Sequence, residues 1–133
     1  MILAPVLLLA AVAAGCGDDE TSTVTPTPPV AVTESFAGTV TVNGAFSHTF
    51  IVERAGQVTA QVTALAPDDT VTIGLALGTW NGTACQLIIT NDAAKLSTVM
   101  LGTATGPGVL CVRVSDAGLL SAATNYEVRV DHY

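Results

Sequence analysis

Few side chains in this sequence have the types and spacing that catalysis needs. The two histidines are His48 and His132, and general acid–base catalysis requires such a group to be positioned by neighbouring side chains. The alternating residues around His48 place it on an apolar face with Phe46 and Phe50, so we interpret it as a hydrogen-bonded histidine of the core or its rim. His132 is expected to be frayed and solvated. No serine lies in a Gly-x-Ser-x-Gly motif, so the sequence predicts no catalytic residue and no enzyme.

Two loops carry side chains that could bind a ligand. Asp68 and Asp69 follow a proline and offer the oxygen ligands that calcium prefers, although an Asx turn in water is the favoured interpretation. Trp80, the only tryptophan, precedes Asn81-Gly82 and could stack on a sugar ring or anchor a protein partner. The favoured interpretation of Trp80 is that it caps one end of the core. The alternative, that it contacts a ligand, is kept. No metal site and no cofactor are predicted.

The composition excludes several classes of protein. Of 133 residues, 50% are hydrophobic and 11% are charged, and the net charge is −7 from 4 Lys and Arg against 11 Asp and Glu. Nucleic-acid binding requires clustered cations, and so does a peripheral helix on an anionic membrane, so neither is expected. The apolar content is too high for a disordered chain, and the length fits one domain.

The start of the sequence resembles the leader of a bacterial lipoprotein. Ile2 to Ala14 form an apolar segment that is too short to span a bilayer but is typical of the core of a secretory signal. The small residues Val12-Ala13-Ala14-Gly15 lead into Cys16, and the acidic segment Gly17-Asp18-Asp19-Glu20 follows. The resemblance implies that residues 1–15 are a signal peptide cleaved before Cys16, and that the Cys16 sulfur carries a diacylglycerol.

This leader implies a location and a tether. The protein is expected in the bacterial cell envelope, attached to a membrane through the lipid on Cys16 and facing the periplasm or the surface. Residues 16–33 form the expected linker, which is rich in Thr and contains Pro26, Pro28 and Pro29. Proline favours an extended backbone, so at about 3 Å per residue the linker could hold a domain about 50 Å from the membrane.

From residue 34 to residue 133 the sequence alternates between apolar and polar residues. Segments of this kind are separated by turn signals at intervals near ten residues, and Asn43-Gly44 is the strongest hairpin signal among them because both residues tolerate the positive φ of a type I′ turn. The pattern predicts an all-β fold, an antiparallel two-sheet β-sandwich of about eight strands, jelly-roll-like or Ig-like. The expected strands cover residues 35–42, 46–52, 57–65, 71–77, 85–90, 96–101, 110–114 and 126–130.

Cys85 and Cys111 are expected to form a disulfide. Export places them in an oxidising compartment, and no Cys-x-x-Cys pair or nearby group of further Cys or His favours a redox or metal site. They lie 26 positions apart, and the chain-entropy model gives about 3.5 kcal/mol for a loop of this size.

Three segments of the expected domain resemble the bacterial pre-peptidase C-terminal domain, a β-sandwich attached to secreted proteases and other exoproteins. They are Phe50-Ile51-Val52 with Ala55-Gly56-Gln57-Val58-Thr59, then Pro107-Gly108-Val109-Leu110-Cys111-Val112-Arg113-Val114, and Asn125-Tyr126-Glu127-Val128-Arg129-Val130. The resemblance implies an accessory or targeting module rather than a catalyst.

Two functions remain after these exclusions. The first is a non-catalytic cell-envelope lipoprotein whose β-sandwich binds a protein or a polysaccharide. The second is a structural subunit that self-assembles through sheet edges, which weakly charged, Thr-rich strands would permit.

Overall fold

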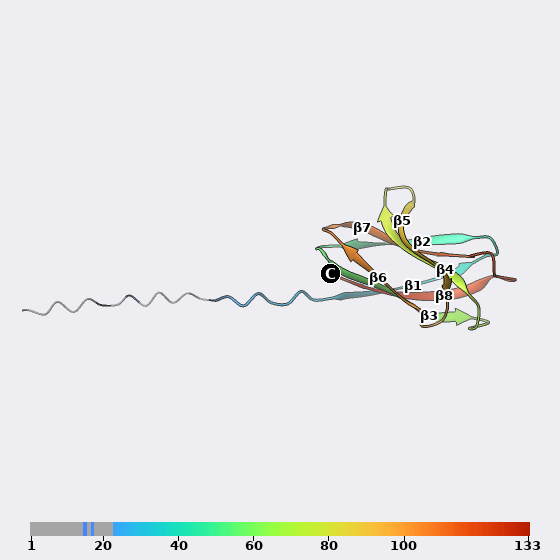
Figure 1. Cartoon of the computed structure of the whole chain (residues 1–133), viewed down its shortest axis with the longest axis horizontal. Helices are drawn as coiled ribbons and strands as arrows, with labels where there is room; N and C mark the ends of the chain where they lie inside the picture. The colour runs from blue at the N-terminus through green and yellow to red at the C-terminus, as the bar shows by residue number, and fades with distance from the viewer. Residues whose placement is uncertain (1–14, 16, 18–22) are drawn as a thin grey trace, which may run out of the picture.

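The computed structural model describes residues 15, 17 and 23–133, and within them it is all-β. Eight strands form two antiparallel sheets of four, with the orders β1-β8-β3-β6 and β2-β7-β4-β5 (Figure 1). The strands are β1 (Val32–Val40), β2 (Ala45–Val52), β3 (Gly56–Ala66), β4 (Ile73–Trp80), β5 (Cys85–Ala94), β6 (Val99–Ala104), β7 (Gly108–Ser115) and β8 (Thr124–His132). The predicted antiparallel β-sandwich of about eight strands is therefore confirmed.

The core lies between the two sheets and is filled by one face of each strand. Alternation correctly predicted the buried faces of β4, β7 and β8, because a strand with one face in a core must place an apolar residue at every second position. Valine dominates the largest fully buried positions, as its branched side chain suits a pleated surface. The largest fully buried side chains are Val40, Val52, Val62, Ile73, Leu75, Cys111, Val112, Val114, Val128 and Val130.

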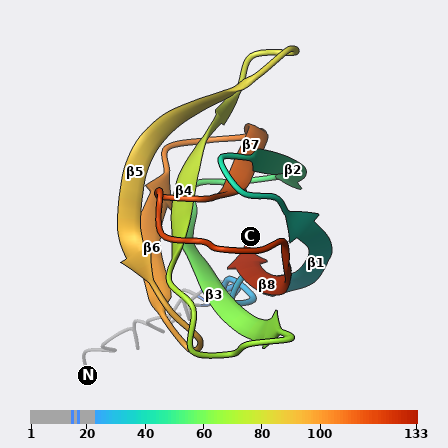
Figure 2. The same cartoon turned by 90° about the vertical axis from the view of Figure 1, so that its right-hand side faces the viewer.

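The two open flanks of the sandwich differ. The edge strands β1 and β2 lie along one flank, and β5 and β6 lie along the other (Figure 2). Aromatic rings close the first flank, where Phe36 stacks on His48 with 5.1 Å between ring centroids and Phe50 stacks on His132 at 5.2 Å. The second flank has a groove, described below.

The predicted hairpin at Asn43-Gly44 is wrong. The turn runs from Thr41 to Gly44, whose N–H donates to the Thr41 carbonyl at 2.8 Å, and Asn43 alone takes a positive φ, of 58°. Val42 and Asn43 are therefore the two central residues of the turn. A type II turn requires a positive φ only at the second central residue, which here is Asn43. The turn leads from one sheet to the other, because β1 pairs along its whole length with β8 and β2 with β7.

The register of β3 and the bounds of several strands also differ from prediction. A β-bulge after Val62 shifts the register of β3 against β8. Alternation from Val62 would place Ala64 in the core, but Leu65 is buried and Ala64 is exposed. β5 continues to Ala94, and β6 begins at Val99 and continues to Ala104, into a segment expected to be a loop. β1 begins at Val32, before the expected start of the domain at residue 34.

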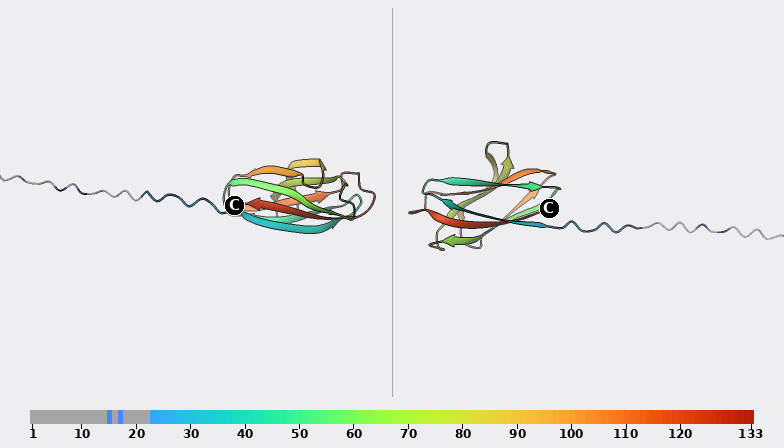
Figure 3. Two further views of the ribbon diagram at one scale, coloured as in Figure 1. Left: turned by 90° about the horizontal axis from the view of Figure 1, so that it is seen from below. Right: turned by 180° about the vertical axis from the view of Figure 1, so that it is seen from behind.

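Upstream of β1 the chain runs away from the domain. Residues 23–31 belong to no strand, are exposed and continue roughly in line with β1 (Figure 3). Cys16 and all of the expected signal peptide except Gly15 lie outside the described residues. In the part of the chain that is described, no helix is long and apolar enough to cross a membrane.

Candidate functional site

The tip of the β4–β5 hairpin rises from the outer face of its sheet (Figure 1). In a flat sheet, strands on either side of a third are about 10 Å apart, yet the Cα atoms of Cys85 on β5 and Cys111 on β7 are only 5.8 Å apart across β4. The predicted Cys85–Cys111 disulfide is confirmed and fixes this bend.

Gly78 on β4 makes the bend possible. A Cβ at this position would overlap the carbonyl oxygen of Gln86 on β5, so only glycine allows the two backbones to approach this closely. The register of β4 against β5 also shifts between Leu77 and Gly78. Sequence reasoning missed this bend, although Gly78 inside an apolar strand was a signal for it.

A cleft lies between the raised hairpin and the adjoining ends of β2 and β7. Its volume is about 430 Å³, which is within the range of small-molecule sites. Trp80 at the end of β4 and Arg113 on β7 line it, together with Ser47, Thr83 and the Cys85 end of the disulfide. Ala45, Phe46 and Ala84 complete the lining. We call this the hairpin cleft.

Trp80 is the last residue of β4 and does not lie on the expected loop, and the favoured interpretation, that it caps one end of the core, is wrong. It is half-buried and does not belong to the hydrophobic core cluster, because alternation along β4 turns Leu75 and Leu77 inward and Trp80 outward. Its place in the hairpin cleft is consistent with the other interpretation, a ligand contact.

Arg113 is the residue of the cleft that sequence reasoning did not single out. Of the four cations, Arg54, Lys95 and Arg129 are exposed and Arg113 alone is half-buried. Within the described residues Arg129 pairs with Asp131 at 3.1 Å, whereas Arg113 forms no ion pair. No other lining residue of the hairpin cleft is charged.

His48 occupies the predicted position at the rim of the core. Its Nε2 lies 2.7 Å from the Tyr126 hydroxyl, and its ring packs between Phe36 and Phe46. Burial lowers the pKa of His48 and raises the pKa of Tyr126. These directions favour the neutral forms of both groups, which suits a structural hydrogen bond.

The prediction that His132 is solvated is wrong. Its side chain is only 3% exposed, and Nε2 lies 2.7 Å from Glu34 Oε2 on β1. The position near the end of the sequence was misleading because β8 pairs with β1 up to His132 itself. The contact joins the ends of two neighbouring strands, and His132 also stacks on Phe50.

Asp68 and Asp116 accept hydrogen bonds that stabilise turns and loops. Asp68 Oδ1 accepts hydrogen bonds from the N–H and the hydroxyl of Thr70, which is the favoured Asx turn, and these bonds lower the pKa of Asp68. Asp116 accepts a backbone hydrogen bond from Asn43 and others from Gly118, Leu119 and Leu120. The bond from Asn43 is the main cause of the lowered pKa of Asp116. Among the described residues, no group of three or more His, Cys, Asp or Glu side chains is placed to hold a metal ion.

A second hollow, the flank groove, lies between the edges of β5 and β6. Its volume is about 400 Å³, and the Gly-rich β6–β7 turn closes one end. Ile88 on β5 belongs to its lining and is 71% exposed. The lining of the flank groove contains no charged residue.

No protein-family model and no curated protein matches this chain.

Proposed function

We propose that the protein is a non-catalytic, lipid-anchored binding module of the bacterial cell envelope, and that it binds its protein or polysaccharide ligand in the hairpin cleft. The observation that carries this proposal is the cleft itself. It combines one half-buried indole, one half-buried guanidinium and the hydroxyls of Ser47 and Thr83 on a wall fixed by a disulfide.

This combination suits binding. Ligand sites are concave and carry a few placed polar groups that fix the orientation of the ligand. Trp and Arg are the residues that most often dominate binding energy, and a wall fixed by a covalent bond loses little entropy when a ligand binds. The sheet positions Trp80 and Arg113 on neighbouring strands, so the ligand meets a preformed surface.

The exposed segment before β1 supports the proposed anchor. A tether from Cys16 to Val32 would leave the domain free to meet ligands about 50 Å from the membrane. The intact mass of the protein from native membranes tests the anchor. We expect a chain that begins at Cys16, is heavier by a diacylglycerol and an acyl group, and is lighter by two hydrogens for the disulfide. An uncleaved chain without lipid would refute this part of the proposal.

Binding is tested by sedimentation of the protein, in detergent micelles, with purified envelope polysaccharide and with envelope protein. Trp80→Ala should abolish co-sedimentation while leaving the thermal unfolding midpoint almost unchanged, since Trp80 lies outside the core. Leu119→Ala serves as control because Leu119 is 66% exposed on a loop outside both hollows. Unchanged co-sedimentation of the Trp80→Ala variant would refute the role of the cleft.

The flank groove supports the alternative function, a structural subunit that self-assembles through sheet edges. β5 and β6 each pair with only one strand in the described domain, and Ile88 is exposed in the groove between them. An assembling subunit should sediment as larger species at higher concentration and dissociate on dilution, and Ile88→Lys should prevent this. A monomer at every concentration would exclude this alternative.

A further inference from the structure

The hairpin cleft carries one positive charge in a strongly negative protein. The net charge of the chain is −7, and Arg113 is the only charged residue that lines the cleft. From Thr70 to Asn91, the segment that contributes Trp80, Thr83 and Cys85, there is no charged residue at all. The guanidinium of Arg113 is therefore the only charged group that the lining of the cleft presents to a ligand.

Arg113 is a half-buried residue with no ion-pair partner among the described residues, which makes its guanidinium a candidate site for an anion. Arg presents its N–H groups in a fork that matches a carboxylate with two parallel hydrogen bonds. Elsewhere in the described domain, Arg129 has such a partner in Asp131. Eleven acids are available in the chain, and those of the described domain leave Arg113 without a partner.

The remaining lining of the cleft fits a sugar ring. A pyranose has an apolar C–H face, which packs on an aromatic plane, and a rim of hydroxyls, which need hydrogen-bond partners. Trp80 supplies the aromatic surface, and Ser47 and Thr83 supply hydroxyls within the same hollow of about 430 Å³. A polyanionic peptide would need more cations than this one, since the rest of the protein repels it.

We infer that the ligand of the hairpin cleft is an acidic saccharide, whose carboxylate binds Arg113 and whose ring packs on Trp80. This inference rests on the proposed binding function and names the chemical class of its ligand. The net negative charge of the protein then contributes to specificity, because it disfavours polyanions that do not fit the cleft.

The indole of Trp80 is a built-in probe, since it is the only tryptophan in the chain. The full chain in detergent micelles is titrated with galacturonic acid trimer, with the neutral galactose trimer and with a hexaglutamate peptide, and Trp80 fluorescence is followed. We expect the acidic trimer to bind at least about tenfold more tightly than the neutral trimer, as a charge-assisted hydrogen-bonded pair requires. Raising the salt concentration from about 0.01 M to 1 M should weaken the binding of the acidic trimer and leave the binding of the neutral trimer unchanged.

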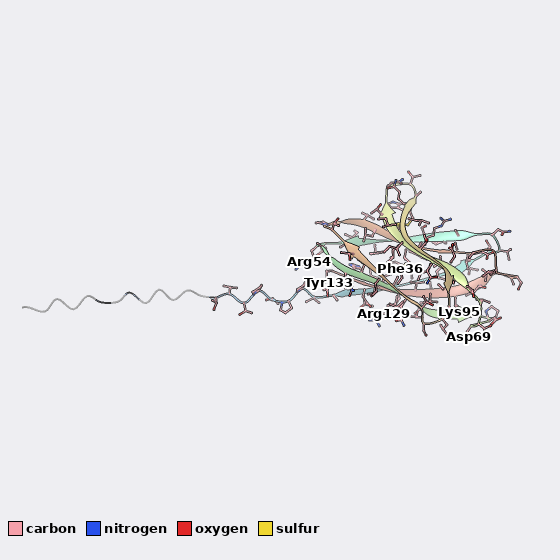
Figure 4. The ribbon with its side chains drawn as sticks, viewed as in Figure 1. Phe36, Arg54, Asp69, Lys95, Arg129 and Tyr133 are labelled. Carbon is pink, nitrogen blue, oxygen red and sulfur yellow. A yellow bond between two sulfur atoms is a disulfide. The ribbon has the colours of Figure 1, made fainter. Side chains whose placement is uncertain are left out.

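Matched substitutions assign the effect to Arg113. Arg113→Gln should reduce the affinity for the acidic trimer to that for the neutral trimer, whereas Arg129→Gln, on the opposite sheet (Figure 4), should leave it unchanged. If the Arg113→Gln variant does not fold, the affinity of the Arg113→Lys variant and the salt dependence of binding by the unmodified chain still test whether Arg113 binds the carboxylate. Lys retains the charge but lacks the fork, so partial loss is expected.

The failures are distinguishable. Equal binding of acidic and neutral trimers, no effect of Arg113→Gln, or equally tight binding of the hexaglutamate would overturn the acidic-saccharide assignment. If no trimer binds while Trp80→Ala still abolishes co-sedimentation with envelope material, the inference is wrong and the proposed function stands. If Trp80→Ala has no effect in either assay, both are wrong.

Discussion

Replacing both cysteines by alanine should destabilise the domain by about 4.5 kcal/mol. The disulfide closes a loop with a sequence separation of 26, for which the chain-entropy model gives about 3.5 kcal/mol. Cys111 is 0% exposed, so the missing sulfur leaves a small cavity that adds about 1 kcal/mol. Small domains are stable by about 5–15 kcal/mol, so this is a large fraction of the total.

Urea unfolding followed by Trp80 fluorescence and by circular dichroism measures this loss. With a slope of about 1–3 kcal/mol per M, the midpoint should fall by roughly 1.5–4.5 M. The unmodified chain in reductant is the control, since it loses the bond but keeps both sulfurs, and its loss should be nearer 3.5 kcal/mol. A loss below about 1 kcal/mol in both cases would refute the reasoning, because the disulfide would then not restrict the unfolded chain.

Three further predictions concern single residues. Gly78→Ala should destabilise the domain and weaken ligand binding in the cleft, because its Cβ would overlap the Gln86 carbonyl; an unchanged melting temperature would contradict this. Since burial lowers the pKa of His48, the stability that its neutral form contributes is complete above pH 6.5 and is lost as the pH falls through the lowered pKa. Urea titrations from pH 7.5 to 5 should show this slope, and His48→Gln should remove it; an equal slope in the variant would assign it to other groups. Asp116→Ala should lower the melting temperature and speed amide hydrogen exchange at Asn43, because the Asn43 N–H loses its acceptor. Unchanged exchange would show that the Asp116 carboxylate does not stabilise the turn at Asn43.

The sequence was sufficient for the fold class because alternation has a direct physical cause. A strand between a core and solvent must repeat every second residue, so Tyr126, Val128 and Val130 could be assigned to the core without a structure. The disulfide was predictable because two cysteines in a domain that the leader led us to expect outside the cytoplasm favour a disulfide over a redox or metal site.

The pairing of strands was not predictable in the same way. A tight turn such as the one at Asn43 connects neighbouring segments, but the choice between one sheet and two depends on partners far away in the sequence. β1 finds β8 and β2 finds β7, and no local pattern encodes these contacts. The burial of His132 was missed for this reason.

The candidate site depended on a bend that alternation does not describe. Trp80 was singled out by its type, but its neighbour in the cleft, Arg113, looked like an ordinary outward residue of a strand. They line one hollow because the β4–β5 hairpin rises at Gly78 and is linked to β7 by the disulfide. Two signals in the sequence could have indicated this bend. They are Gly78 in the interior of β4 and Cys85 at the start of β5.

The pairing of β1 with β8 also determines how the domain would respond to mechanical load. The tether continues in line with β1, and β1 is held by nine successive residue pairs, from Val32 with His132 to Val40 with Thr124 (Figure 3). The C-terminal residue Tyr133 lies at this same end of the sandwich, where its carbonyl accepts a hydrogen bond from the Glu53 N–H at 2.9 Å (Figure 4). If the proposed tether were pulled against a ligand bound in the cleft, the force would be directed along β1, so all nine pairs would be sheared together and none would be peeled off first. We expect this geometry to slow forced unfolding, so the segment before β1 leads into a strand arranged to bear tension.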